Sequence, residues 1–127
     1  MNRQPYRLFI ISNKDVLTKI SSACSQDWKA PIMIAAVAQP KEAWVRGDGE
    51  EYWKTDTAIL LHNVSLAAFA EGVGTCWIAA FDEKKVKEIL GLGLDSRVLF
   101  LSPLGYSTET KGPIRNRKKL EAIVTYL

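Results

Sequence analysis

The chain has 127 residues, of which 47% are hydrophobic and 24% charged, and its formal net charge is +3. This length suits one domain with a real core and no second domain, and the composition excludes a disordered chain. Cys24 and Cys76 have neither the spacing of a metal site nor the density of a disulfide scaffold, and the first residues do not resemble a signal peptide. We therefore expect a reduced, cytoplasmic protein.

The first half of the chain predicts a strand, a helix and a second strand. Apolar residues favour a strand over residues 6–11, and Asn13 can cap a helix whose apolar face is formed by Val16, Leu17, Ile20, Ala23 and Cys24. The run PIMIAAVAQ after it has the length of an interior strand. Residues 39–54 contain Trp44, Tyr52 and Trp53 and are predicted to be a long loop. Such a loop is either a functional lid or is simply fastened to the core by its aromatic residues.

The stretch of residues 56–82 is the centre of the pattern. From residue 58 to residue 70 the only polar side chains are His62, Asn63 and Ser65, so a helix here is apolar around nearly its whole circumference. A helix of this kind is expected to be buried on all sides, and it is too short and too interrupted for a membrane span. We therefore expect it to be the central helix of a soluble domain or of a dimer interface.

The ends of this central helix also have sequence signals. Thr55 or Asp56 is expected to cap its start, and Gly72 is expected to end it in the left-handed conformation. The aromatic and apolar residues 75–81 then predict a buried strand.

The remaining residues predict a helix, a strand and a tail. Asp82 is expected to cap a helix that ends at Gly91, and RVLFLSPLGY predicts a strand stopped by Pro103 and Gly105. The tail has a turn at residues 111–113 and a closing AIVTYL, which favours pairing with a sheet edge of this subunit or of a partner. The alternation of strands and helices, taken alone, indicates a parallel α/β sheet.

The ionisable residues offer little catalytic chemistry of their own. The sequence contains no nucleophile elbow, phosphate loop or metal-ligand spacing, and the single histidine has no obvious catalytic companion. Gly72 and Gly74 lack the third glycine and the context of a dinucleotide-binding turn. We assign no catalytic side chain and no metal ligand, and we expect a cofactor to carry the chemistry if the protein is an enzyme.

Two arginines near the C-terminus form a candidate anion site. In an extended segment Arg115 and Arg117 point to the same side, so both guanidinium groups can converge on one phosphate. The alternative is a solvated basic tail, which the bare sequence favours. Nucleic-acid binding is not expected, because the patch is small and has no interleaved aromatic residues.

Three segments, taken in order, resemble the nitroreductase-like flavoproteins over nearly the full chain. Asn2-Arg3-Gln4-Pro5-Tyr6-Arg7 is similar to the Asn-x-Gln-Pro-Trp segment of that family. Residues 56–82 are similar to its Asp, Asn, Leu-Ala-Ala, Gly-x-Gly-Thr and Phe-Asp pattern. Residues 117–124, Arg-Lys-Lys-Leu-Glu-Ala-Ile-Val, are similar to its Arg-Lys-Pro-Leu-Glu-Glu-Ile-Val.

The resemblance implies an α+β fold with a mixed central sheet flanked by helices. It implies one domain over residues 1–127, with residues 107–127 as an extended tail that packs on a partner subunit. The implied protein is a homodimer that binds FMN at the subunit interface. It is not expected to bind a membrane. It takes hydride from NADH or NADPH and passes it to a nitroaromatic, quinone or similar acceptor in a ping-pong cycle.

The resemblance also implies site residues by position. Asn2 and Gln4 are expected near the flavin ring or ribityl chain, and the backbone of residues 78–80 is expected to face the flavin with an N–H near N5. The full set of expected flavin-binding residues is Asn2, Gln4, Ile78, Ala79, Ala80, Arg115 and Arg117, with both arginines on the phosphate. The substrate side is expected to include Trp44 and Phe81.

The chain departs from the family pattern at its start. It lacks the Arg-x-Ser-x-Arg motif and the Pro-Ser pair that precede the Asn-x-Gln-Pro segment, as if it began roughly three dozen residues into the family. We therefore expect either a truncated chain or a naturally short member. Two other functions stay open: a non-catalytic dimerising domain with weak or no flavin binding, and an anion-binding module without redox activity.

Overall fold

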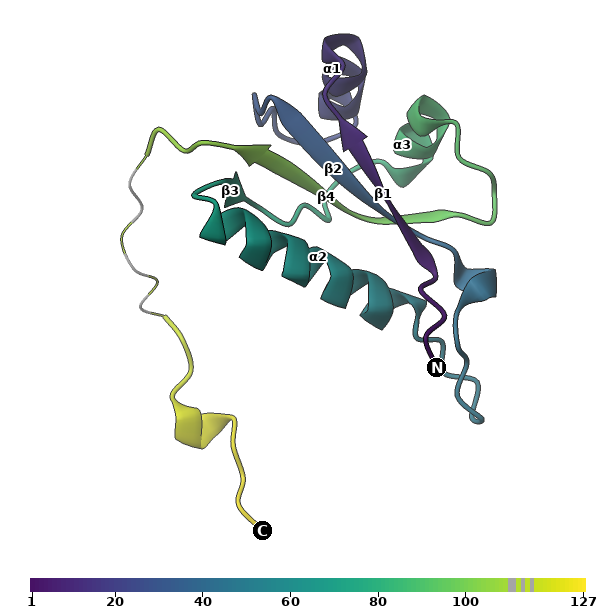
Figure 1. The fold of residues 1–127 in the computed structure, drawn as a ribbon, viewed down its shortest axis with the longest axis vertical. Coiled ribbons are helices and arrows are strands. Elements are labelled where there is room, and N and C mark those ends of the chain that lie inside the picture. Colours follow the sequence, from purple (N-terminus) through teal and green to yellow (C-terminus); the bar gives the residue numbers. More distant parts are fainter. Residues whose placement is uncertain (110–111, 113, 115) are drawn as a thin grey trace.

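The computed structural model describes residues 1–109, 112, 114 and 116–127, and it contains a four-stranded sheet in the order β1-β2-β4-β3 (Figure 1). The strands are β1 (Tyr6–Ile11), β2 (Ile32–Ala38), β3 (Gly74–Thr75) and β4 (Arg97–Gly105). All three strand pairings are antiparallel. The parallel sheet indicated by the alternation alone is therefore wrong, and the strands described in this single chain do not form the mixed sheet that the resemblance implies.

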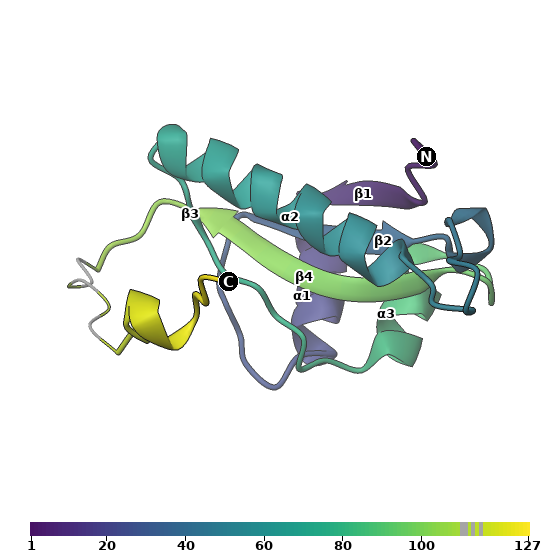
Figure 2. The same cartoon turned by 90° about the horizontal axis from the view of Figure 1, so that it is seen from below.

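Three helices cover the two faces of this sheet unequally. α1 (Lys14–Ser22) and α3 (Glu83–Leu90) lie on one face, and α2 (Trp53–Ala70) lies alone on the other (Figure 2). The main core forms between the sheet and the α1/α3 pair, and its buried residues are Ile11, Ile20, Ala23, Met33, Ala35, Val37, Ile78, Val86, Val98 and Leu101. Two short 3₁₀ helices, η1 (Pro40–Glu42) and η2 (Leu120–Ala122), complete the described elements.

The ends of α1 and α3 follow from local side-chain chemistry. The Asn13 side chain accepts hydrogen bonds from the backbone N–H groups of Asp15 and Val16, which α1 leaves without internal partners. Asp82 caps α3 in the same way by accepting from the N–H of Lys85, and Gly91 ends that helix with a left-handed φ of 63°. These caps, and the strands at residues 6–11 and 32–38, confirm the sequence predictions.

The start of α2 differs from the prediction. The helix begins at Trp53 rather than after Thr55 or Asp56, and the preceding Tyr52 makes no side-chain capping bond. Burial accounts for the earlier start, since the buried Trp53 indole packs where the helix first meets the sheet and donates to Glu51 at 2.8 Å. At the other end Gly72 adopts a left-handed φ of 72°, as predicted.

The long apolar helix is not buried on all sides in a single chain. Its buried residues are Trp53, Thr57 and Leu61, all of which face the sheet side. On its open side Ile59 is 56% exposed, Leu66 55% and Phe69 82%. The single chain alone does not bury the helix on all sides, because α2 is the only helix on its face of the sheet and nothing else in the described chain covers it. Burial of its open side in a dimer interface stays a prediction.

Pro103 determines how much of the predicted strand over residues 75–81 forms. The register pairs Thr75 with Leu104 and Ile78 with Leu101, which puts Cys76 opposite Pro103. Ile78 and Leu101 exchange both backbone hydrogen bonds, at 2.9 and 3.0 Å, so the next pair of this kind would need an N–H on Pro103. Proline has none. β3 is therefore two residues long and is followed by isolated bridges, while β4 continues through Pro103 instead of stopping there.

The C-terminal residues form an arm outside the sheet. Every described residue from Tyr106 onward is exposed, and Figure 1 shows residues 116–127 extending away from the sheet and helices. The closing AIVTYL overlaps the end of η2 and is in no strand of the described structure. The turn predicted at residues 111–113 falls on positions that are mostly outside the described residues.

Candidate functional site

The backbone between β3 and α3 carries several N–H groups without a partner among the described residues, and two of them belong to exposed alanines. Ile78 is tied to Leu101 on β4, and the N–H of Asp82 donates to the carbonyl of Ala23 at the end of α1 at 2.8 Å. Between these two ties, Ala79 and Ala80 are exposed, and their N–H groups have no partner among the described residues. Small side chains and unpaired donors on a fixed backbone suit a flat ligand that offers hydrogen-bond acceptors.

One side chain anchors this segment from the α2 side. The indole N–H of Trp77 donates to Oγ of Ser65 at 2.9 Å, and the Trp77 ring lies 4.9 Å from the Phe100 ring, tilted by 46°. Trp77 begins the strand end of residues 77–81 at which the flavin is expected, but it is not among the individually predicted flavin-binding residues. The available signal was Ser65, one of three polar residues within an otherwise apolar stretch of helix.

The predicted amide residues lie at the opposite edge of the sheet. Asn2 and Gln4 are exposed just before β1, and the Gln4 amide donates to the Asn2 side chain at 2.9 Å. In the order β1-β2-β4-β3, three strand spacings separate β1 from the Ile78 segment, which is roughly 14 Å at about 4.8 Å each. One chain does not bring Asn2 and Gln4 together with Ala79 and Ala80.

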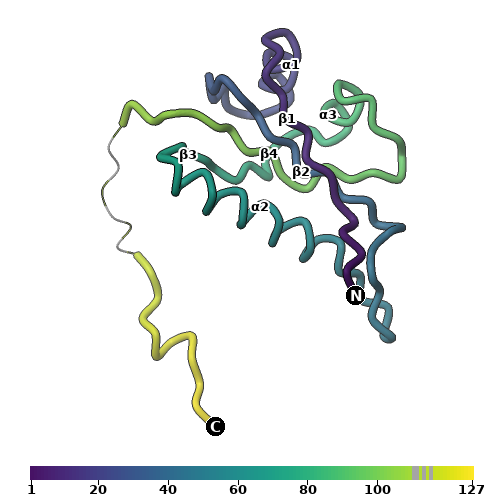
Figure 3. The backbone as a smooth tube through the Cα atoms, viewed as in Figure 1, coloured from purple at the N-terminus to yellow at the C-terminus, as the bar shows by residue number. Residues whose placement is uncertain are grey.

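The two arginines predicted to bind phosphate lie near the C-terminus of the sequence. Arg115 lies outside the described residues, and Arg117 is exposed at the start of the arm's last described stretch. Figure 3 shows residues 116–127 leading away from the sheet.

The two residues predicted for the substrate side have different surroundings. Trp44 is half-buried in the loop before α2, and its ring lies 4.9 Å from the ring of Tyr52. A bridge between Val45 and Glu51 closes that loop into a short hairpin. Phe81 is half-buried against the core and bridges to Cys24. Both residues stay predictions for substrate contact.

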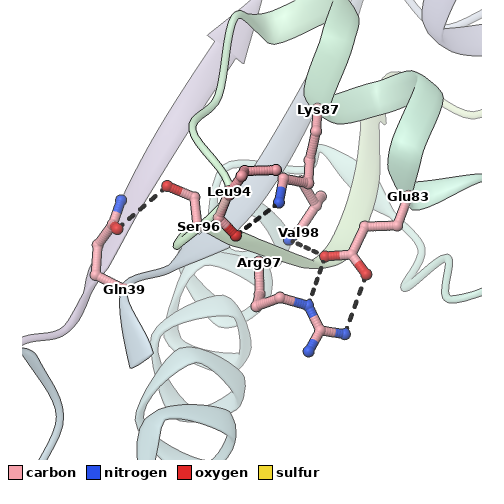
Figure 4. Close-up of polar contacts among 7 residues, drawn as sticks. All are labelled: Gln39, Glu83, Lys87, Leu94, Ser96, Arg97 and Val98. Carbon is pink, nitrogen blue, oxygen red and sulfur yellow. Dashed lines mark hydrogen bonds and ion pairs between the residues drawn. The ribbon is translucent and has the colours of Figure 1, made fainter. Parts of the chain in front are cut away.

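An ion pair fixes the start of α3, directly after the candidate segment. The Glu83 carboxylate accepts hydrogen bonds from Nε and Nη2 of Arg97 at 2.8 and 3.1 Å, and from the N–H of Val98 at 2.9 Å (Figure 4). The hydrogen bond from Arg97 holds the pKa of Glu83 below its ordinary value, with the Val98 N–H acting in the same direction against partial burial. The Glu83 carboxylate is therefore ionised at neutral pH and keeps its ion pair with Arg97.

A cavity lies beside β3 at one end of the sheet. It has a volume of about 490 Å³ and is lined by residues 28–31, by residues 74–76, by Pro103 and by residues 105–109.

Among the residues that the structure describes, no group of three or more histidine, cysteine, aspartate or glutamate side chains is arranged to hold a metal ion. No helix within the described residues has the length and apolar character needed to cross a bilayer.

Comparison with known proteins gives the family. A model of the Nitroreductase family matches residues 27–106. A nitroreductase family protein of Clostridium difficile 630 superposes with a TM-score of 0.91 at 28% identity, over 98% of this chain and 75% of that one. An FMN-dependent nitroreductase from Clostridium difficile R20291 superposes with a TM-score of 0.80 at 20% identity, over 97% and 75% of the two chains. The latter likeness supports the fold alone.

A curated relative extends the same result at the level of sequence. It is an Archaeoglobus fulgidus protein provisionally named NADH dehydrogenase/NAD(P)H nitroreductase, 25% identical over 114 residues. The match covers 87% of this chain and 66% of that protein. The α+β nitroreductase-like fold expected from the sequence is confirmed by the superpositions. Because the family model covers more than half of its residues, the chain belongs to the nitroreductase family.

Proposed function

We propose that this protein is an FMN-dependent NAD(P)H oxidoreductase that reduces nitroaromatic, quinone or similar acceptors and acts as a homodimer. The observation that carries the proposal is the exposed backbone at Ala79 and Ala80, whose N–H groups have no partner among the described residues. FMN, when bound, would supply hydride transfer from NADH or NADPH to the acceptor. The protein's task is to bind and orient the flavin and to leave one face of it open.

The residues that are present fit FMN by their donor chemistry. Two backbone N–H groups suit the acceptor atoms at the edge of a flavin ring, and the methyl side chains of Ala79 and Ala80 leave room for the ring itself. The exposed amides of Asn2 and Gln4 suit the ring or the ribityl chain, and the guanidinium of Arg117 suits the phosphate. No side chain is required as general acid or base in this proposal.

The distribution of these residues supports a site shared by two subunits. Asn2 and Gln4 lie before β1, and Ala79 and Ala80 lie beyond β4 at the other edge of the same sheet. Arg117 belongs to an arm that extends away from its own sheet. A site that uses all of these groups would need the complementary set from a second copy.

Two exposed apolar surfaces are candidate interfaces with the second copy. The first is the open side of α2, formed by Ile59, Leu66 and Phe69, and the second is the arm, whose exposed apolar residues include Leu120, Ile123, Tyr126 and Leu127. Apolar surface of this extent on a small protein marks an interaction site more often than chance exposure. We infer that α2 packs on its counterpart in the partner and that the arm crosses onto the partner subunit.

A comparison of FMN with riboflavin tests the proposed function. The full chain is expected to bind both, to bind FMN more tightly because of the phosphate, and to oxidise NADH or NADPH with a quinone acceptor. Arg117→Gln should weaken FMN binding roughly ten- to a hundredfold and leave riboflavin binding unchanged, since a charge-assisted hydrogen bond contributes about 1.5–3 kcal/mol. Lys118→Gln is the matched control for loss of one positive charge.

Each other outcome rejects part of the proposal. A dimer that binds neither flavin would instead be a non-catalytic dimerising domain. A chain that binds inorganic phosphate through Arg117, but not riboflavin, would be an anion-binding module. Flavin binding without oxidation of NADH or NADPH would reject the oxidoreductase activity while keeping the site.

A further inference from the structure

We propose that Trp77 is a positioning residue, which holds the backbone donors of Ala79 and Ala80 in place through its hydrogen bond to Ser65 on α2. The inference rests on the proposed function, because the donors matter only if a flavin uses them. It adds a pair of residues to that function which the sequence motifs do not assign.

The need for an anchor arises at Pro103. The ladder between β4 and the Gly74–Thr75 strand would continue through Cys76, but its partner Pro103 has no N–H to donate. Cys76 itself contributes only a long contact of 3.8 Å from its Sγ to the carbonyl of Trp77. Cys76 thus lacks its ladder bonds to β4, and Trp77 faces Ser102 at a position where an antiparallel ladder has none, shortly before Ala79 and Ala80.

The Trp77 side chain supplies a fixed point at this break. Its indole N–H lies 2.9 Å from Oγ of Ser65, and Oγ of Ser65 in turn donates to the carbonyl of Leu61 at 2.9 Å. The hydroxyl therefore has a defined orientation as acceptor for the indole. Contact with the Phe100 ring holds the second side of the indole against β4. Trp77 connects the segment to a helix and to a strand at once.

The contacts of Trp77 explain how a partly exposed tryptophan is held in one position. Trp77 is 40% exposed, so burial alone does not fix its position, and the hydrogen bond to Ser65 and the ring contact do. Its neighbour Ile78 points into the core on the other face of the sheet. With Trp77 anchored to the α2 side and Ile78 to the α1/α3 side, the chain enters Ala79 and Ala80 in one orientation.

Preorganised donors bind better than mobile ones, since less conformational entropy is lost on binding. Removing the acceptor by Ser65→Ala releases the indole and is expected to loosen the two alanine amides. The affinity for FMN should fall roughly two- to tenfold, the range for one neutral hydrogen bond. Ser65→Thr keeps a hydroxyl at the same position, so the order of the two alanine amides and the affinity for FMN should stay close to those of the unmodified chain. Trp77→Phe keeps a ring against Phe100 without the N–H and should resemble Ser65→Ala.

The experiment measures the amides and the affinity separately in the full chain. ¹⁵N relaxation without added FMN gives the order parameters of Ala79 and Ala80, and titration with FMN gives the dissociation constant. Ser22→Ala is the matched control, because Ser22 on α1 also bonds a carbonyl of its own helix, at 2.7 Å to Lys19, and has no tryptophan partner. The control is expected to change neither quantity.

The order parameters decide the inference, and FMN binding by the unmodified chain decides the proposed function. Lower order parameters and weaker FMN binding in Ser65→Ala alone support the positioning role. Equal order parameters in Ser65→Ala and Ser22→Ala overturn it, whether or not FMN binds. Lower order parameters with unchanged FMN affinity also overturn it, because the anchored donors would then contribute nothing to the flavin site.

Discussion

Arg97 and Glu83 join the start of β4 to the start of α3 by a two-point ion pair, with Nε to Oε1 at 2.8 Å and Nη2 to Oε2 at 3.1 Å. The same guanidinium lies 5.5 Å from the centre of the Trp53 ring at the start of α2. Since α2 and α3 cover opposite faces of the sheet, Arg97 contacts both layers at one end of it, through Glu83 on α3 (Figure 4) and through Trp53 on α2. It also fixes the residue that follows the Asp82 cap.

The first prediction concerns this pair. Glu83→Gln should lower the free energy of unfolding by about 1 kcal/mol at neutral pH, because Arg97 loses its anionic partner while remaining half-exposed to water. Urea unfolding followed by circular dichroism measures the change. Asp48→Asn is the matched control, as Asp48 makes a similar two-point pair with Arg46 in an exposed loop. An equal loss in both variants would contradict the connecting role of Glu83.

The second prediction is the pH dependence of the same contribution. The pKa of Glu83 is lowered in the folded protein, chiefly by the hydrogen bond from Arg97. A lowered pKa means that the stabilisation is fully present above the ordinary glutamate value of 4.5 and is lost as the pH falls through the folded-state pKa. Unfolding curves of the unmodified chain and Glu83→Gln should therefore differ at pH 7 and converge in acid. A difference that persists below both pKa values would disprove this.

The third prediction separates the two sides of α2. Leu61 is fully buried against the sheet, and Leu61→Ala should cost about 2–4 kcal/mol of stability through lost contacts and a cavity. Leu66 is largely exposed in the single chain, so Leu66→Ala should change the unfolding free energy of the monomer by less than about 0.5 kcal/mol. Both values come from unfolding at protein concentrations low enough to keep the chain monomeric. Similar losses would mean that the described one-sided packing is wrong.

The fourth prediction tests the proposed dimer at the exposed end of the same helix. Phe69→Lys should weaken self-association at least tenfold, because the charge would be desolvated in an apolar interface. Sedimentation velocity over a concentration series measures this. Leu94→Lys, at an equally exposed leucine in the loop before β4, controls for the added charge and the lost apolar surface. A monomeric unmodified chain would reject the dimer outright.

The fifth prediction uses two neighbouring glycines. Gly91 ends α3 with φ at 63°, so Gly91→Ala should destabilise the protein by about 1 kcal/mol. Gly93 has no left-handed φ and open space where a Cβ would be, and Gly93→Ala should be neutral or slightly stabilising. Thermal unfolding of the two variants gives the comparison. A loss at Gly93 as large as that at Gly91 would indicate a cause other than backbone conformation.

The sequence determined those features that depend on neighbouring residues. Asn13 and Asp82 cap helices with their own side chains, Gly72 and Gly91 adopt the left-handed conformation that few other residues tolerate, and the strands at residues 6–11 and 32–38 follow from local apolar runs. The order of strands and helices was predictable for the same reason. The three family-like segments predicted the family because they occur in the right order along the chain.

Only the tertiary structure decided which surfaces meet. Because α2 is apolar around its circumference, its sequence does not show which side packs on the sheet. Only one side of α2 is covered, because α1 and α3 both pack on the opposite face of the sheet. Pro103 and Cys76 are far apart in sequence, so the break in the ladder depends on a register that no local pattern contains. The positions of Asn2 and Ala79 at opposite sheet edges follow from strand order alone, because long-range pairing, not local preference, sets which strands are neighbours.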